Sequence, residues 1–139
     1  QVPFRIIPGI SSGIGGLAYA GIPLTHRATS RVVTFLTGHN AQSVAATSVD
    51  WQAVAKGSQV LVLYMSLRNI KEIADLLIQA GRPTHEPVAL ISRATYPDQK
   101  VLVTTLKEVG HVSTGLPAPT LIVIGETVNL RNELDWLRS

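Results

Sequence analysis

The chain has 139 residues, enough for one ordinary domain that buries its own core. Apolar residues make up 45% of it and charged residues only 15%, which excludes a disordered, highly charged segment. Because there is no cysteine, disulfides, zinc–cysteine sites, iron–sulfur clusters and thiol nucleophiles are excluded. The net charge is +3 and the basic residues are scattered, which argues against nucleic-acid binding and suits a small anionic ligand.

The ends of the chain and its apolar runs bear on its location. No apolar run reaches the roughly 18 residues of a membrane-spanning helix, and no signal-peptide pattern opens the chain. With cysteine absent, we expect a cytoplasmic protein with no membrane partner. The chain begins without Met, directly in an apolar segment typical of a strand. We therefore expect residues 1–139 to form one domain of a longer protein.

Segments typical of strands and helices alternate along the chain. Six short apolar runs bounded by turn residues are candidate strands and predict a sheet of about five strands, most of them buried on both faces. These runs are Phe4–Ile7, Arg31–Leu36, Gln59–Tyr64, Pro87–Ile91, Lys100–Thr104 and Thr120–Ile124. The turn residues 96–99 predict an antiparallel hairpin of the fourth and fifth runs. Residues 40–50 are small and polar and predict a surface loop.

The predicted helices lie between these strands, at Ser12–Ala20, Trp51–Ala55, Leu67–Ala80 and Leu106–Val112. The third is clearly amphipathic, with Ser66 as its expected cap and Gly81 as its end. The tail, residues 127–136, predicts a strand edge followed by a helical turn. The alternation predicts an α/β fold with a mixed, roughly five-stranded sheet flanked by helices.

A glycine-rich segment, residues 9–15, follows the first predicted strand and opens a helix, as phosphate-binding loops do. It is similar to the glycine segment of short-chain dehydrogenases, and Tyr96 and Lys100 have the spacing of their catalytic pair. That pair must share one helical face, whereas Pro97-Asp98 predicts a turn between them. Residues 31–40 also lack the acidic residue expected of a dinucleotide site. NAD(P) binding by a dehydrogenase-like protein is therefore a distant alternative.

Three other segments are candidates for a ligand crevice: Thr25-His26-Arg27, Thr37-Gly38-His39 and Tyr64-Met65-Ser66. Arg27 is suited to carboxylates, and the other two segments follow predicted strands, whose ends face ligand crevices in α/β sheets. For each, an ordinary loop or core role is the alternative. The four histidines lack metal-ligand spacing, so we predict no metal. No nucleophile–base set or carboxylate pair is evident, and we expect solvent to cover Glu72, Asp75 and Glu86 and packing to account for Trp51 and Trp136.

Several segments together resemble one family. They are Pro8-Gly9-Ile10-Ser11-Ser12, the stretch Ala18–Arg27, Thr37-Gly38-His39, Asp50-Trp51, Leu63-Tyr64-Met65, residues 121–126 and the ending at residues 130–136. In this order they resemble uroporphyrinogen-III C-methyltransferases of the tetrapyrrole methylase family, including the methyltransferase module of siroheme synthases. The stretch Tyr-Ala-Gly-Ile-Pro-Leu-Thr-His-Arg is the most specific. The resemblance covers essentially the whole chain but only the C-terminal half of the family.

The resemblance implies that the intact enzyme transfers methyl groups from S-adenosyl-L-methionine to uroporphyrinogen III, through precorrin-1, giving precorrin-2 for siroheme or cobalamin synthesis. It implies two α/β domains with the cofactor between them. The missing N-terminal domain would carry the glycine-rich cofactor loop and the proton-moving residues, so this half has no catalytic residue of its own. It also implies a homodimer. A non-catalytic ligand-binding or dimerisation module of the same fold is the alternative.

The resemblance also assigns site residues. Ser11 and Ser12 match the pair that contacts the cofactor, Ala94 matches a small residue near the adenosine, and Met65 matches a methionine that borders cofactor and substrate. Thr25, Arg27 and His39 match polar residues that face the carboxylate-rich tetrapyrrole. Ser66 replaces the family's usual glycine, and the Ser-Ser pair is a mild departure from Thr-Ala or Thr-Ser.

Overall fold

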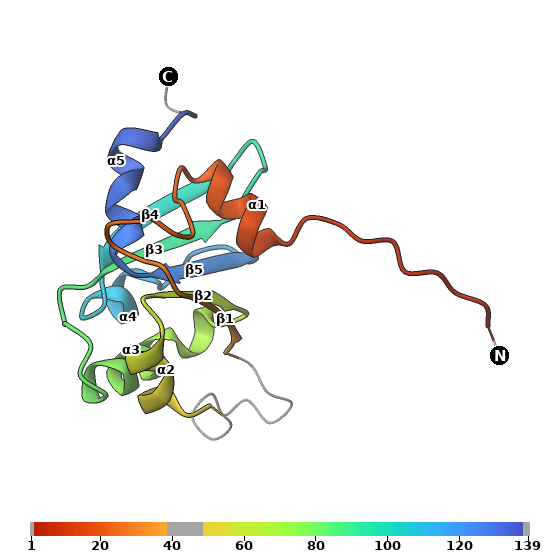
Figure 1. The fold of residues 1–139 in the computed structure, drawn as a ribbon. Coiled ribbons are helices and arrows are strands. Elements are labelled where there is room, and N and C mark those ends of the chain that lie inside the picture. Colours follow the sequence, from red (N-terminus) through yellow and green to blue (C-terminus); the bar gives the residue numbers. More distant parts are fainter. Residues whose placement is uncertain (1, 39–48, 138–139) are drawn as a thin grey trace.

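The computed structural model describes residues 2–38 and 49–137, and within them five strands form one mixed sheet in the order β1-β2-β5-β3-β4 (Figure 1). β1 and β2 run parallel, and the other neighbouring pairs are antiparallel. The predicted fold class and the hairpin of β3 and β4 are therefore confirmed. The strands are β1 Val33–Thr37, β2 Val60–Tyr64, β3 Pro87–Ser92, β4 Lys100–Thr105 and β5 Thr120–Ile124.

Helices cover both faces of this sheet, so its central strands are buried on both sides. In β2, Leu61 and Leu63 join one core cluster while Val60 and Val62 join the other, because successive side chains of a strand point to opposite faces. The first face packs against α2 Trp51–Gly57, α3 Ile70–Gln79 and α4 Val109–Val112. The second packs against α1 Ser12–Tyr19 and the C-terminal 3₁₀ helix η2 Glu126–Leu130, which α5 Arg131–Leu134 follows.

The predicted helix at residues 67–80 is present, but its start differs from the prediction. It opens with a 3₁₀ turn, η1 Leu67–Asn69, before α3 begins. Ser66 occupies the N-cap position of this turn, as predicted, but its buried hydroxyl makes no capping hydrogen bond and instead donates to the carbonyl oxygen of Tyr64 at 2.9 Å. Gly81 ends the helix as predicted, with a φ of +98° that favours glycine.

The prediction of a strand at Phe4–Ile7 is wrong. Residues 2–10 form an extended arm that leaves the body of the domain and pairs with no described strand (Figure 1). The side chains of Val2, Phe4, Ile6, Ile7 and Ile10 are 82–87% exposed. An apolar run forms a strand only where a neighbouring strand takes up its backbone hydrogen bonds, and none does so here.

Three smaller expectations also differ. Residues 126–134 of the tail are helical, as η2 and α5, and the described tail contains no strand edge. Glu86 is buried, not solvated, because its carboxylate accepts hydrogen bonds from the buried guanidinium of Arg82. Trp51 packs in the core as predicted, whereas Trp136 is half-exposed and lies against Tyr19 with the ring centroids 5.4 Å apart.

Candidate functional site

The predicted cofactor residues lie at the edge of the sheet where β1, β2 and β3 end. β5 runs antiparallel to β2 and β3, and its pairing sets Leu63 opposite Ile122 and Ser92 opposite Thr120. The start of β5 therefore lies between the ends of β2 and β3. We call this the C-terminal edge, and Met65 and Ala94 both follow strands that end there.

The N-terminus of α1 reaches the same edge and is tied to the end of β2. Ser11 is the N-cap of α1, and its hydroxyl lies 2.6 Å from the Tyr64 hydroxyl. The backbone N–H of Gly13 donates to the hydroxyl oxygen of Tyr64 at 3.1 Å and to the hydroxyl oxygen of Ser11 at 3.3 Å. Tyr64 thus joins the loop that holds Ser11 and Ser12 to the turn that holds Met65.

The glycines of α1 allow this close approach. A β-carbon on Gly13 would overlap the Tyr64 hydroxyl and lie 2.8 Å from a ring carbon of Phe35. A β-carbon on Gly16 would lie 3.1 Å from that of Ala94, tighter than ordinary contact. Glycine costs about 1 kcal/mol per helical position relative to alanine. The close packing of α1 on the sheet explains why glycine is nevertheless present at these positions.

Met65 is held in an unusual conformation at this edge. Its φ is +51°, which costs a residue with a β-carbon roughly 1–2 kcal/mol, and its side chain is 68% exposed. The preceding carbonyl, of Tyr64, accepts from the backbone N–H of Gly38 at 3.0 Å and from the Ser66 hydroxyl. The neighbouring hydrogen bonds therefore hold the turn while the Met65 side chain faces outward.

A cavity of about 400 Å³ adjoins Met65. It lies between the turn after β2 and the segment that leads into β5, and its lining is mostly apolar, with one charged side chain. The lining residues are Met65, Leu67, Arg68, Ala118, Pro119 and Thr120. The cavity suits a ligand that is largely apolar and carries an anionic group.

Ala94 lies in the strained turn after β3. Arg93 and Thr95, on either side of it, have φ values of +50° and +73°. The guanidinium of Arg93 is bound to the Asp98 carboxylate at 2.8 Å, which secures the turn. The structure therefore brings Ser11, Ala94 and Met65 to one edge, with Ser12 beside them as the first residue of α1.

The predicted substrate residues lie elsewhere or are not described. Thr25 and Arg27 are exposed in the loop that leads into β1, and that loop is tied to the start of β2 where the backbone N–H of Arg31 donates to Gln59 Oε1 at 2.5 Å. They therefore lie one five-residue strand away from the C-terminal edge, about 15 Å. His39 is outside the described residues. In this chain the structure does not bring Arg27 together with Met65.

Reasoning from the sequence did not find two groups at the C-terminal edge. The hydroxyl of Tyr64 had no assigned role, although a tyrosine that ends an otherwise aliphatic strand is a usable signal. Arg68 lies in the predicted amphipathic helix Leu67–Ala80 and had no assigned role either. The alternative pair, Tyr96 and Lys100, shares no helix: Tyr96 lies in the turn and Lys100 opens β4, as predicted.

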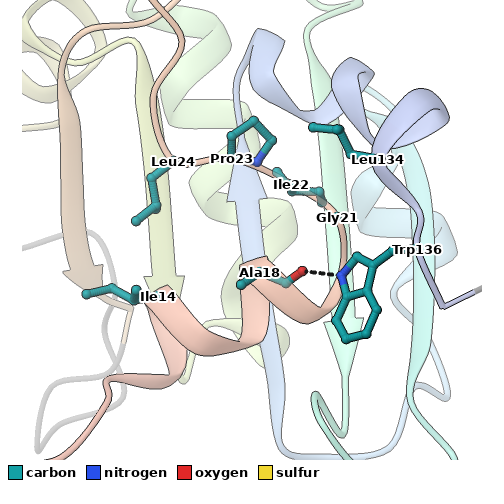
Figure 2. Close-up of a pocket in the computed structure, with 8 residues that line it drawn as sticks. All are labelled: Ile14, Ala18, Gly21, Ile22, Pro23, Leu24, Leu134 and Trp136. Atoms are coloured by element: carbon teal, nitrogen blue, oxygen red, sulfur yellow. Dashed lines mark hydrogen bonds between the residues drawn. The ribbon is translucent and has the colours of Figure 1, made fainter.

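A second hollow, of about 370 Å³, lies between α1, the loop that follows it and the C-terminal tail, and is apolar (Figure 2). It is lined by Ile14, Ala18, Gly21, Ile22, Pro23, Leu24, Leu134 and Trp136. The indole N–H of Trp136 donates to the carbonyl oxygen of Ala18 at 3.0 Å and so ties the tail to α1 (Figure 2). No charged side chain lines this hollow, which makes it a poorer site for an anionic ligand.

The described residues contain neither a metal-binding cluster nor a membrane-spanning helix. No three His, Asp or Glu side chains among them are grouped so that they hold a metal ion. In the same part of the chain, no helix has the length and apolar character needed to cross a membrane.

Comparison with known proteins is consistent across sequence and structure. Residues 1–110 match the family of Tetrapyrrole (Corrin/Porphyrin) Methylases. The chain is 50% identical over 139 residues to a uroporphyrinogen-III C-methyltransferase of Sinorhizobium sp, covering 99% of this chain and 50% of that protein. It is 44% identical over 135 residues to a siroheme synthase of Sodalis glossinidius, covering 97% of this chain and 28% of that one. The chain thus spans half or less of the length of these relatives.

Solved structures agree. Uroporphyrin-III C-methyltransferase from Thermus thermophilus, complexed with S-adenosylhomocysteine, superposes with a TM-score of 0.78 at 27% identity, over 93% of this chain and 55% of that one. A cobalt precorrin-4 methyltransferase of cobalamin biosynthesis gives a TM-score of 0.78 at 25% identity, over 89% of this chain and 52% of that one. The family match, which extends over most of the chain, and the shared fold establish that this chain belongs to the tetrapyrrole methylases.

Proposed function

We propose that this chain is the C-terminal domain, residues 1–139, of a uroporphyrinogen-III C-methyltransferase. The proposed reaction transfers methyl groups from S-adenosyl-L-methionine to uroporphyrinogen III, through precorrin-1, and gives precorrin-2. One observation carries the proposal: Ser11, Ser12, Met65 and Ala94, which match the family's cofactor residues, lie at one edge of the sheet, where Met65 lines a cavity. This chain spans half or less of the length of its relatives, which supports a further domain that holds the rest of the site.

The residues at the C-terminal edge fit this cofactor. The exposed hydroxyls of Ser11 and Ser12 offer hydrogen bonds to its polar groups, and the partly buried methyl group of Ala94 adds a small apolar surface at the same edge. The exposed thioether of Met65 is a soft, apolar surface beside them. When bound, the cofactor supplies an electrophilic methyl group on a sulfonium. The role of this half is to bind, to orient and to exclude water.

Thr25, Arg27 and His39 complete the proposal as residues that face the tetrapyrrole. Arg27 is exposed, and its side chain makes no hydrogen bond or ion pair with another residue that the structure describes, so its guanidinium is available to a carboxylate. Since Arg27 and Met65 lie at opposite ends of β1, substitutions at the two positions probe the substrate site at separate places.

The partners and location are part of the same proposal. We expect the full-length protein to be a cytoplasmic homodimer that serves siroheme or cobalamin synthesis. Sedimentation of the full-length protein tests the dimer. A protein that remains monomeric at micromolar concentration contradicts it.

The decisive experiment measures methyl transfer by the full-length protein that contains this chain. The substrates are methyl-labelled S-adenosylmethionine and uroporphyrinogen III, and the product is identified as precorrin-2. Met65→Ala and Arg27→Ala should each depress the rate without lowering the melting temperature, and Lys56→Ala, on the exposed end of α2, is the matched control. If both variants keep full activity, the site assignment is wrong. If the wild-type protein binds neither S-adenosylhomocysteine nor the tetrapyrrole, the methyltransferase proposal fails.

A further inference from the structure

Arg68 is an uncommitted cation at the cavity beside Met65. Four other arginine side chains, those of Arg31, Arg82, Arg93 and Arg131, bind a carbonyl oxygen or a carboxylate of the chain. The guanidinium of Arg68 makes no hydrogen bond or ion pair with any residue that the structure describes, and its side chain is exposed. Its five N–H donors are therefore available to a ligand.

The backbone that carries Arg68 is firmly held. The backbone N–H of Asn69 donates to the carbonyl oxygen of Ser66 at 3.0 Å, and the Asn69 side-chain amide donates to the carbonyl oxygen of Gly38 at 3.1 Å. Ile70, which follows, is 1% exposed in the core. These bonds tie the 3₁₀ turn to the residues that follow β1 and β2, so Arg68 projects from a stable base.

The surroundings of Arg68 favour an anionic partner. It is the only charged residue that lines the cavity among those the structure describes, and Met65, Leu67 and Pro119 supply apolar surface. Apolar walls lower the local dielectric constant and strengthen a charge pair formed against them. Glu72, four residues further along, forms no ion pair with Arg68, and the ion pair on this helix is that of Lys71 with Asp75 at 2.9 Å.

We propose that Arg68 binds a carboxylate of the tetrapyrrole substrate beside Met65, as a specificity-determining residue. This inference rests on the proposed function and adds a residue to its substrate site. A guanidinium binds a carboxylate through two parallel hydrogen bonds, which fixes orientation as well as adding affinity. Such a contact favours a porphyrinogen that carries acetate groups over one in which methyl groups replace them.

The test uses the full-length protein with Arg68→Gln, Arg68→Lys and, as the matched control, Lys107→Gln, an exposed cation at the opposite edge of the sheet. We expect Arg68→Gln to raise KM for uroporphyrinogen III about tenfold at low ionic strength, with kcat within about twofold of wild type. Arg68→Lys should raise KM by a smaller factor, because a lysine keeps the positive charge but makes no bidentate contact. The difference should shrink in about 0.5 M salt, since the site is open to solvent.

A second readout needs no turnover. Fluorescence titration with uroporphyrin III should give a weaker Kd for Arg68→Gln and an unchanged Kd for Lys107→Gln, while the Kd for S-adenosylhomocysteine stays the same in both. An unchanged Kd and KM for the tetrapyrrole in Arg68→Gln would overturn the inference. The inference would also be overturned if Arg68→Gln raised only the Kd for S-adenosylhomocysteine, which would mean that Arg68 binds the cofactor's carboxylate. A wild-type protein that binds uroporphyrin III but transfers no methyl group refutes the proposed function and leaves the test of Arg68 intact.

Discussion

The two edges of the sheet use their polar groups differently. At the C-terminal edge, Met65, Arg93 and Thr95 all have left-handed backbone conformations, and they are the non-glycine residues in the described part of the chain that do. At the opposite edge, where β2 and β3 begin, Arg82 is buried and donates to Glu86 and to the carbonyl oxygen of Ser58. One edge carries strain and exposed groups, and the other is held by a buried, hydrogen-bonded ion pair.

This difference separates stability from binding. Strained backbone persists only where the surroundings hold it, and it is concentrated where a protein places ligand-binding groups. A buried ion pair contributes little net stability as a pair, but removing one partner leaves the other charge buried and alone. Substitutions that break the buried pair at the opposite edge should therefore change folding, and substitutions of exposed side chains at the C-terminal edge should change binding more than folding.

The largest effect is expected for Arg82→Ala. The side chains of Arg82 and Glu86 are 6% and 9% exposed, so the variant leaves a buried carboxylate without its partner. We expect the free energy of unfolding to fall by about 3–5 kcal/mol, measured by urea denaturation. Lys71→Ala is the matched control, because Lys71 and Asp75 have the same spacing but are 70% and 53% exposed, and its expected cost is below about 0.5 kcal/mol.

A double variant sharpens this test. Arg82→Met with Glu86→Leu replaces both charges by apolar groups of similar size, and we expect it to recover most of the lost stability. If Arg82→Ala costs no more than Lys71→Ala, the opposite edge is not held by this pair and the contrast between the edges is wrong.

The next effect is that of Gly13→Ala in α1. In an exposed helix this change stabilises by about 1 kcal/mol, but here the new methyl group meets Tyr64 and Phe35. We expect a loss of about 1–3 kcal/mol by denaturation, together with weaker binding of S-adenosylhomocysteine by calorimetry. Gly57→Ala, with nothing within 4 Å of the added carbon, is the control and should not destabilise. A stabilising Gly13→Ala would show that α1 does not pack this tightly.

A smaller effect is expected for Tyr64→Phe. The variant keeps the ring but removes the hydroxyl that binds Ser11 and the N–H of Gly13. We expect a cost of about 1 kcal/mol in the free energy of unfolding, because Gly13 retains the Ser11 oxygen as an acceptor. Tyr96→Phe, in an exposed turn, should cost nothing measurable. Equal melting temperatures for the Tyr64 variant and wild type would contradict the conclusion that the Tyr64 hydroxyl stabilises the contact between α1 and the end of β2.

The smallest stability difference concerns the backbone of Met65. Glycine adopts a positive φ without penalty, so Met65→Gly should be about 0.5–1 kcal/mol more stable than Met65→Ala. Both variants should lose affinity for S-adenosylhomocysteine, because both remove the exposed thioether. Thermal denaturation and calorimetry of the two variants side by side check this. If Met65→Ala proves the more stable, the strain at this position has no energetic consequence.

Local pattern predicted most of the fold. Continuous apolar runs located β2, β3 and β5, because strands buried on both faces have no polar face to interrupt them. The spacing of apolar residues located α3, and Gly81 its end. The same reasoning failed at residues 4–7, since an apolar run does not say whether another strand is present to pair with it. It also failed at Glu86, because the partner that buries it, Arg82, is recognised only in the folded chain.

By itself, the sequence determined the α/β class, the order of most elements and the residues that resemble a methylase's cofactor site, because these depend on local spacing and residue type. Only the tertiary structure decided which of those residues meet. It places Ser11, Met65 and Ala94 at one edge through Tyr64 and the glycines of α1, sets Thr25 and Arg27 at the other end of β1, and leaves Arg68 free beside Met65. The pairing register and the packing of α1 join segments more than fifty residues apart in sequence, for example Ser11 and Tyr64 at a separation of 53, and no local pattern encodes that distance.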